Sequence, residues 1–265
     1  MKNILVPISS NENAVNTLQY AINFAEKTKA KIYLVHIFSS TKISGAFVKI
    51  DNILERDSKK ILDDLLAKVD HKEVRILRKS LKGHNDVDSI GDFCKLFKID
   101  LIITSAKNDE SDNSVFLGKV TGGMLKDLSY PTLIIPSSAT FKPIDKIFMA
   151  IKSGKIQSEK TLFPLFDIKN NFNSKIDLLQ VKTPLLEEKD LALNTELENN
   201  ISNLISTKNA TVFQGVLEFL HEEDPDIICV IKRKRGFFKK LWQNDIVKKL
   251  DFESNIPLLV LKGIS

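Results

Sequence analysis

Residues 31–37 read Lys31-Ile-Tyr-Leu-Val-His-Ile37, and 144 positions later the chain reads Lys175-Ile-Asp-Leu-Leu-Gln-Val181. The same offset of 144 carries the apolar stretch 2–7 onto the stretch 146–151. Self-similarity at a fixed spacing is the signature of a repeated structural unit. The sequence therefore predicts two copies of one unit in tandem.

The second copy is shorter than the first. Near the ends of the copies, Asp100-Leu-Ile-Ile103 matches Asp226-Ile-Ile-Cys229, and 130–135 matches 256–261, both at an offset of 126. The offset falls from 144 to 126, so the second copy lacks 18 residues somewhere between positions 181 and 226. Surface loops and helix ends tolerate such a loss better than buried strands do.

Within the first copy, short apolar runs alternate with amphipathic stretches. Continuous apolar runs are typical of strands buried on both faces of a parallel sheet, and spacings of three and four indicate helices. The predicted strands cover 4–7, 32–38, 74–80, 101–104 and 132–135, and the predicted helices cover 13–29, 52–68, 87–98 and 120–128. This alternation predicts an α/β fold of two doubly wound domains, 1–138 and 143–265, each with a five-stranded parallel sheet.

The composition is that of a globular protein, with 43% hydrophobic and 28% charged residues among 265. We expect a cytoplasmic protein, because the sequence has no signal peptide and no apolar run of about 18 residues. Cys94 and Cys229 lie in different copies and the four histidines do not cluster, so no zinc site is expected. The net charge of +5 permits an acidic partner without requiring one.

Both copies resemble universal stress protein domains, in the tandem two-domain form of that family. The stretches that carry the resemblance are 2–10, 30–37, 100–103, 116–121 and 130–136 in the first copy and 226–231, 235–238, 241–242 and 256–260 in the second. The resemblance implies a Rossmann-like, adenine nucleotide alpha hydrolase-like fold. It also implies that the last strands, around Leu133 and Leu259, pair in an internal pseudo-dimer, and it leaves further homodimerisation open.

Many family members bind ATP, and the resemblance implies where a nucleotide would bind in the first copy. Glycines there let backbone N–H groups approach phosphates, and a helix N-terminus adds favourable charge. The candidate residues by resemblance are Pro7, Ser9, Ile37, Thr104, Ser105, Asn108, Gly118, Lys119 and Val120. The sequence departs from the family pattern, because Ser9 stands at the acidic position and Ser105 and Asn108 at two glycine positions. The second copy keeps no glycine of this loop.

One basic run is the sharpest charge feature of the chain. Lys232, Arg233, Lys234 and Arg235 are candidate anion-binding residues, with Phe237, Phe238 and Trp242 interleaved or close by. Basic residues beside aromatic ones can contact phosphates or nucleic acid. A solvated loop whose aromatics pack into the core or an interface is the alternative and the favoured interpretation, so we do not expect nucleic acid as a partner.

No group of residues has a convincing catalytic spacing, and His36 lies within an apolar strand, where packing in the core is the expected role. The sequence therefore favours a non-enzymatic stress-response protein with a degenerate nucleotide loop, which acts through an unidentified protein partner or ligand. The alternative is a sensor that binds ATP or AMP in the first copy only. A weak nucleotide hydrolase is a third and less favoured hypothesis.

Overall fold

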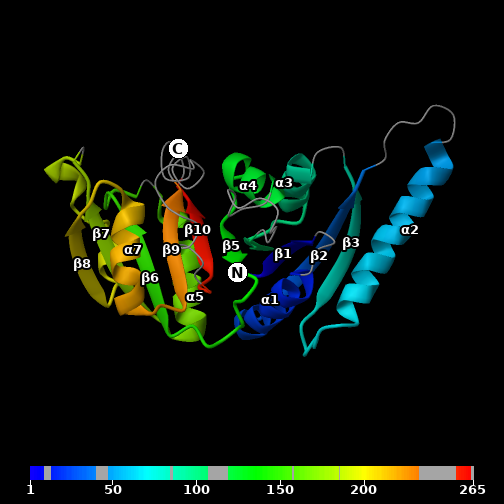
Figure 1. Ribbon diagram of the computed structural model, residues 1–265, viewed down its shortest axis with the longest axis horizontal. Helices are drawn as coiled ribbons and strands as arrows, with labels where there is room; N and C mark the ends of the chain where they lie inside the picture. Colours follow the sequence, from blue (N-terminus) through cyan, green and yellow to red (C-terminus); the bar gives the residue numbers. More distant parts are fainter. Residues whose placement is uncertain are drawn as a thin grey trace. The chain divides into compact units, whose positions relative to one another are not determined.

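A computed structural model of the chain describes residues 1–8, 13–39, 47–83, 86–106, 119–156, 158–184, 186–232 and 255–263. The chain divides into two compact units, and the later junction between them falls between Phe141 and Lys142. Figure 1 labels the strands and most of the helices of both units. Among the residues that the structure describes, no helix is long and apolar enough to cross a membrane.

Unit 1 is a five-stranded sheet in the order β3-β2-β1-β4-β5, and its strand pairings are parallel. Its elements are β1 (Asn3–Ile8), α1 (Ala14–Thr28), β2 (Lys31–Phe38), α2 (Phe47–Leu66), β3 (Ile76–Lys82), α3 (Asp86–Leu96), β4 (Leu101–Ser105), α4 (Lys119–Asp127) and β5 (Thr132–Ile135). The predicted alternation of strands and helices is therefore confirmed, although several element ends are shifted. The largest shift is at α2, which begins at residue 47 and not at 52, because the apolar spacing starts before the charged residues do.

Helices cover both faces of the unit 1 sheet (Figure 1). Tyr33 and Val35 of β2 pack in one core cluster with Ile90 of α3 and Met124 of α4. Side chains alternate between the two faces of a strand, so His36 points to the opposite face, where its ring contacts α2. α1 packs on this second face as well.

Unit 2 repeats this plan in the order β10-β9-β6-β7-β8, again with parallel pairings. Its elements are β6 (Lys146–Ile151), the 3-10 turn η1 (Glu159–Thr161), α5 (Phe163–Phe172), β7 (Lys175–Lys182), the 3-10 turn η2 (Glu188–Asp190), α6 (Thr195–Glu198), β8 (Asn203–Lys208), α7 (Val212–Glu223), β9 (Ile227–Lys232) and β10 (Leu258–Lys262). In unit 1, β5 is the last strand of the order, next to β4. In unit 2, β10 holds the equivalent place, next to β9. Their pairing in a pseudo-dimer stays a prediction.

The structure locates the deletion in the second copy. The connection from β2 to β3 in unit 1 spans 39–75, whereas the connection from β7 to β8 in unit 2 spans only 183–202. The next connections, 83–100 in unit 1 and 209–226 in unit 2, are equal in length. The long helix α2 of unit 1 therefore has only the short helix α6 and the turn η2 as its counterpart.

One local contact recurs in both units, and it shows that the first strands of the two copies correspond at an offset of 143, one less than the sequence comparison predicted. Asp100 Oδ2 accepts hydrogen bonds from the backbone N–H groups of Lys2 and Asn3, at 2.7 and 2.9 Å. Asp226 Oδ2 accepts from the corresponding groups of Asp145 and Lys146, both at 2.8 Å. Each carboxylate fixes the start of the central strand of its unit, so the repeat extends from the sequence to individual hydrogen bonds.

Candidate functional site

The central strand β1 lies at the point where the chain order of unit 1 reverses. After β1 the chain adds β2 and β3 on one side, and it then returns to place β4 and β5 on the other. Ligands of open α/β sheets bind outside the carboxyl ends of the strands at such a switch point. The candidate site is therefore the edge where β1, β2 and β4 end.

Four of the predicted site residues lie at this edge. Pro7 is the second-last residue of β1, Ile37 is the second-last of β2, and Thr104 and Ser105 end β4. Ile37 is partly buried against the core cluster that α3 and α4 cover, and so is Val120 in the first turn of α4. The topology thus brings together residues that lie far apart in the sequence.

Hydroxyl groups tie the end of β4 to the start of α4. Thr104 Oγ1 lies 3.2 Å from Thr121 Oγ1, and Thr121 Oγ1 donates to the carbonyl oxygen of Ser105, also at 3.2 Å. Both threonines are buried, with exposed fractions of 4% and 6%. These bonds hold the N-terminus of α4 next to the strand end, where its free N–H groups favour an anion.

Several predicted residues lie outside the described part of the chain, namely Ser9, Asn108, Gly118, Arg233, Lys234 and Arg235. Lys119 begins α4, and Lys232 ends β9 in register with Lys262 of β10. The proposed roles of all these residues stay predictions. Among the placed residues, no three His, Cys, Asp or Glu side chains gather in an arrangement that could hold a metal ion.

His36 lies next to the candidate edge but faces α2. Its Nδ1 is 2.9 Å from the hydroxyl oxygen of Ser58, whose exposed fraction is 1%. Burial lowers the pKa of His36, and the negative charge of Asp86 opposes that shift. A hydroxyl this deeply covered is out of reach of a substrate, so the pair stabilises the packing of α2 on β2.

The carboxyl edge of unit 2 is covered by the unit's own chain. The segment 188–194, which we call the covering segment, follows β7 and exchanges two backbone hydrogen bonds with Gly154 in the loop after β6. Gly154 N–H donates to the carbonyl oxygen of Asp190 at 3.0 Å, and Asn194 N–H donates to the carbonyl oxygen of Gly154 at 3.1 Å. This contact places the covering segment at the end of β6, the counterpart of β1.

Side chains reinforce the same contact. Gln180 of β7 donates from Nε2 to the carbonyl oxygen of Leu191 at 2.8 Å, and Lys155 Nζ lies 2.8 Å from Asp190 Oδ1. The strand registers align Asn3 of β1 with Lys146 of β6, so the counterpart of Ser9 is Lys152, which is followed by the buried Ser153.

Gly154 permits this close approach because it has no side chain. A Cβ at this position would lie 2.2 Å from the carbonyl oxygen of Ala192 and 2.7 Å from Leu193 Cα. The sequence analysis did not predict the contact of Gly154 with the covering segment, because the two are far apart along the chain. The available signals were a glycine just after a buried strand and a connection too short for a full helix.

The strand order and the alternation of strands and helices define a tandem Rossmann-like α/β protein. A family model described as the universal stress protein family matches residues 1–136. A universal stress protein of Methanocaldococcus jannaschii is 22% identical over 139 residues, which are 51% of this chain and 81% of that protein. The chain belongs to the universal stress protein family.

Solved structures show the same fold over the whole chain. A universal stress protein from Archaeoglobus fulgidus matches with a TM-score of 0.74 and 17% identity, over 99% of this chain and 98% of that chain. A protein of unknown function from Pseudomonas aeruginosa matches with a TM-score of 0.60 and 14% identity, over 99% and 92% of the two chains. The tandem arrangement is thus shared with proteins of similar length.

Proposed function

We propose that the chain is a non-enzymatic stress-response protein that acts by binding a protein partner or a ligand, and that unit 2 takes no nucleotide in the family's manner. The observation that carries this proposal is the covering segment on the carboxyl edge of unit 2. Its hydrogen bonds occupy the backbone N–H and carbonyl groups of Gly154 and the side-chain amide of Gln180 at this edge. Any ligand bound in the family's manner is therefore held by unit 1.

A second function, nucleotide sensing by unit 1, is favoured by a different observation. Pro7, Ile37 and Thr104 are the second-last residues of β1, β2 and β4, whose ends form the candidate edge, and the N-terminus of α4 is tied to the same edge. The loss of two loop glycines argues against tight binding, because Ser105 and Asn108 adopt left-handed backbone less readily than glycine does. Lys119 would contribute a positive charge to a phosphate from the first position of α4.

Thermal unfolding with ATP and with AMP, each with and without Mg²⁺, separates the two functions. The degenerate loop predicts no saturable stabilisation below millimolar nucleotide. Saturable stabilisation at sub-millimolar ATP would support the sensor and overturn the degenerate loop. That stabilisation should weaken in Lys119→Ala and persist in Lys95→Ala, a control at an exposed lysine of α3.

Two further measurements complete the test. Mass spectrometry of the denatured protein shows whether a nucleotide is retained through purification. Release of phosphate from ATP at a rate proportional to protein concentration would contradict the non-enzymatic assignment. The triple variant Ser9→Asp, Ser105→Gly and Asn108→Gly should gain ATP affinity, and an unchanged affinity would show that the loop positions are assigned wrongly.

A further inference from the structure

One face of β8, the outer strand of unit 2, is exposed. Val181 and Thr207 point toward α7 on the other face, because a Cβ added at Gly215 of that helix would lie 2.7 and 3.3 Å from their side chains. Side chains alternate between the two faces of a strand. The face of β8 away from α7 therefore carries Leu204, Ser206 and Lys208. All three are exposed, and the exposed fraction of Leu204 is 53%.

In unit 1 the helix α2 covers the corresponding face. β2 and β7 correspond at the offset of 144. Their register partners then align β3 with β8 at an offset of 126. At that offset Arg78, Ser80 and Lys82 of β3 correspond to Leu204, Ser206 and Lys208 of β8. The two outer strands therefore present equivalent positions, covered in one unit and exposed in the other.

Two ion pairs join α2 to β3 in unit 1. Asp51 of α2 pairs with Lys82 at the carboxyl end of β3, and Asp63 of α2 pairs with Arg78 nearer the amino end. α2 therefore runs antiparallel to β3. Leu62, next to Asp63 in the helix, is 1% exposed. The helix that covers β3 thus combines buried apolar side chains with a carboxylate toward each end.

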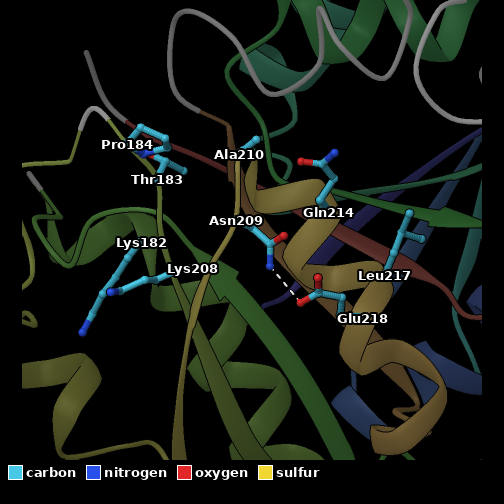
Figure 2. Close-up of a pocket in the computed structure, with 9 residues that line it drawn as sticks. All are labelled: Lys182, Thr183, Pro184, Lys208, Asn209, Ala210, Gln214, Leu217 and Glu218. Carbon is cyan, nitrogen blue, oxygen red and sulfur yellow. Dashed lines mark hydrogen bonds between the residues drawn. The ribbon is translucent and has the colours of Figure 1, made fainter.

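The connection from β7 to β8 does not replace this helix over β8. The covering segment lies over β7, where Leu191 accepts the hydrogen bond from Gln180, and α6 has 4 residues against 20 in α2. Lys208 and its register partner Lys182 have no carboxylate within 4.0 Å among the residues that the structure places. Figure 2 shows both lysine side chains extending away from α7. Unit 2 therefore keeps the positive charge and lacks its acidic partner.

We propose that the exposed face of β8 binds an amphipathic helix of a partner protein, in the position that α2 has on β3. The helix runs antiparallel to β8, with a carboxylate near its N-terminal end facing Lys208 and Lys182. About three turns later it places an apolar side chain on Leu204, where α2 has Asp63 for Arg78. Burial of apolar surface drives the association, and the charges fix its direction.

The chemistry of the face favours a helix over a nucleic acid. A phosphate backbone would pair with the lysines, but it has no apolar group for Leu204. The inference rests on the protein-partner part of the proposed function, and it states the chemistry of that partner. It is independent of nucleotide binding by unit 1, which the thermal unfolding tests address by themselves.

The probe is a synthetic peptide of the sequence 47–66, which forms α2. In the full chain the place of this sequence on unit 1 is already filled, so the peptide reports on unit 2. One version keeps Asp63, and the other carries Asp63→Leu to match Leu204. Fluorescence anisotropy at an ionic strength of about 0.1 M should show saturable binding of the Asp63→Leu version. Its affinity should exceed that of the Asp63 version by about tenfold, because one peptide buries an apolar side chain on Leu204 and the other a carboxylate.

Leu204→Arg should reverse this preference. The substitution restores at β8 the partner that Arg78 provides for Asp63 in unit 1. The peptide that keeps Asp63 should then bind more tightly than the Asp63→Leu version. A merely non-specific apolar contact would weaken for both peptides and would leave their order unchanged, which would contradict the proposal.

Lys208→Glu tests the charged end of the face. It should weaken the Asp63→Leu peptide by about fivefold, and a peptide that also carries Asp51→Lys should recover this loss. Lys175→Glu is the matched control, because Lys175 is an exposed lysine at the amino end of β7. The control should change the affinity by less than about twofold. Urea midpoints of all variants should stay near that of the wild type, since the substituted side chains are exposed.

Three outcomes would overturn the proposal. The first is the absence of saturable binding of either peptide at millimolar concentration. The second is an equal loss of affinity in Lys175→Glu and Lys208→Glu. The third is self-association of the chain in sedimentation that Leu204→Arg abolishes, because a second copy would then be the occupant of this face. None of them changes the outcome of the nucleotide tests, so the proposed function is judged separately.

Discussion

Replacing Gly154 by alanine should expel the covering segment from the carboxyl edge of unit 2. The added Cβ would lie 2.2 Å from the carbonyl oxygen of Ala192, and this neighbour is backbone that cannot turn aside as a flexible side chain would. The substitution is not expected to strain residue 154 itself, because its φ lies outside the left-handed region. The expected effect is therefore a steric one on the contact.

The magnitude follows from the bonds that would be lost. Two backbone hydrogen bonds join Gly154 to the covering segment, and Gln180 donates a third bond to Leu191. Each contributes about 1 kcal/mol net, and the half-exposed ion pair of Lys155 and Asp190 contributes less than about 1 kcal/mol. The free energy of unfolding should therefore fall by about 3 kcal/mol.

Urea unfolding gives the change in stability, and hydrogen exchange gives its location. In Gly154→Ala the amide of Asn194 should lose protection, while the amides of β1 and β2 in unit 1 keep theirs. Lys155→Ala is the control, because it removes the ion pair with Asp190 and leaves Gly154 unchanged, and it should cost less than about 1 kcal/mol with protection retained. Unchanged stability and protection in Gly154→Ala would refute the close contact and, with it, the closed edge of unit 2.

Three further outcomes are expected. Asp226→Ala should lower the free energy of unfolding by about 3 kcal/mol, because its Oδ2 accepts two backbone N–H groups; a loss below about 1 kcal/mol in urea unfolding would contradict this. Lys29→Gly should raise that free energy by about 1 kcal/mol, since Lys29 ends α1 at φ 53°, and a decrease in the urea midpoint would show that its backbone is not strained. The hydrogen bond to Glu223 raises the pKa of Lys146, so its stabilisation is present below the unfolded value of about 10.4 and is lost as pH rises through the higher folded pKa. The difference in urea midpoint between wild type and Lys146→Met should therefore shrink between about pH 9 and pH 12, and a constant difference would exclude this titration.

Much of the fold could be predicted from the sequence because buried parallel strands leave a local signal. Runs such as 32–38 are apolar at nearly every position, and the helices between them show their buried faces through spacing. Element ends were less exact, since they depend on caps and on packing. The start of α2 shows this, because its apolar positions begin at residue 47, before the charged ones.

The candidate site could be predicted only in part. Strand ends that meet at a switch point follow from strand order, so Pro7, Ile37 and Thr104 could be assigned to one edge from the sequence. Bonds that join distant residues leave no pattern in the sequence. The hydroxyl pair of Thr104 and Thr121 is such a case, and so is the register of Lys182 and Lys208.

The sequence by itself determined that the chain holds two copies of one α/β unit and that the second copy is the shorter, because apolar periodicity and repeat offsets are written along the chain. Only the tertiary structure decided where that shortening falls and what the short connection does. Between β7 and β8 the chain has only a short counterpart of the long helix α2, and the covering segment lies against Gly154. The physical reason is that this contact depends on two loops meeting in space, and a glycine shows its missing side chain only where another backbone approaches it.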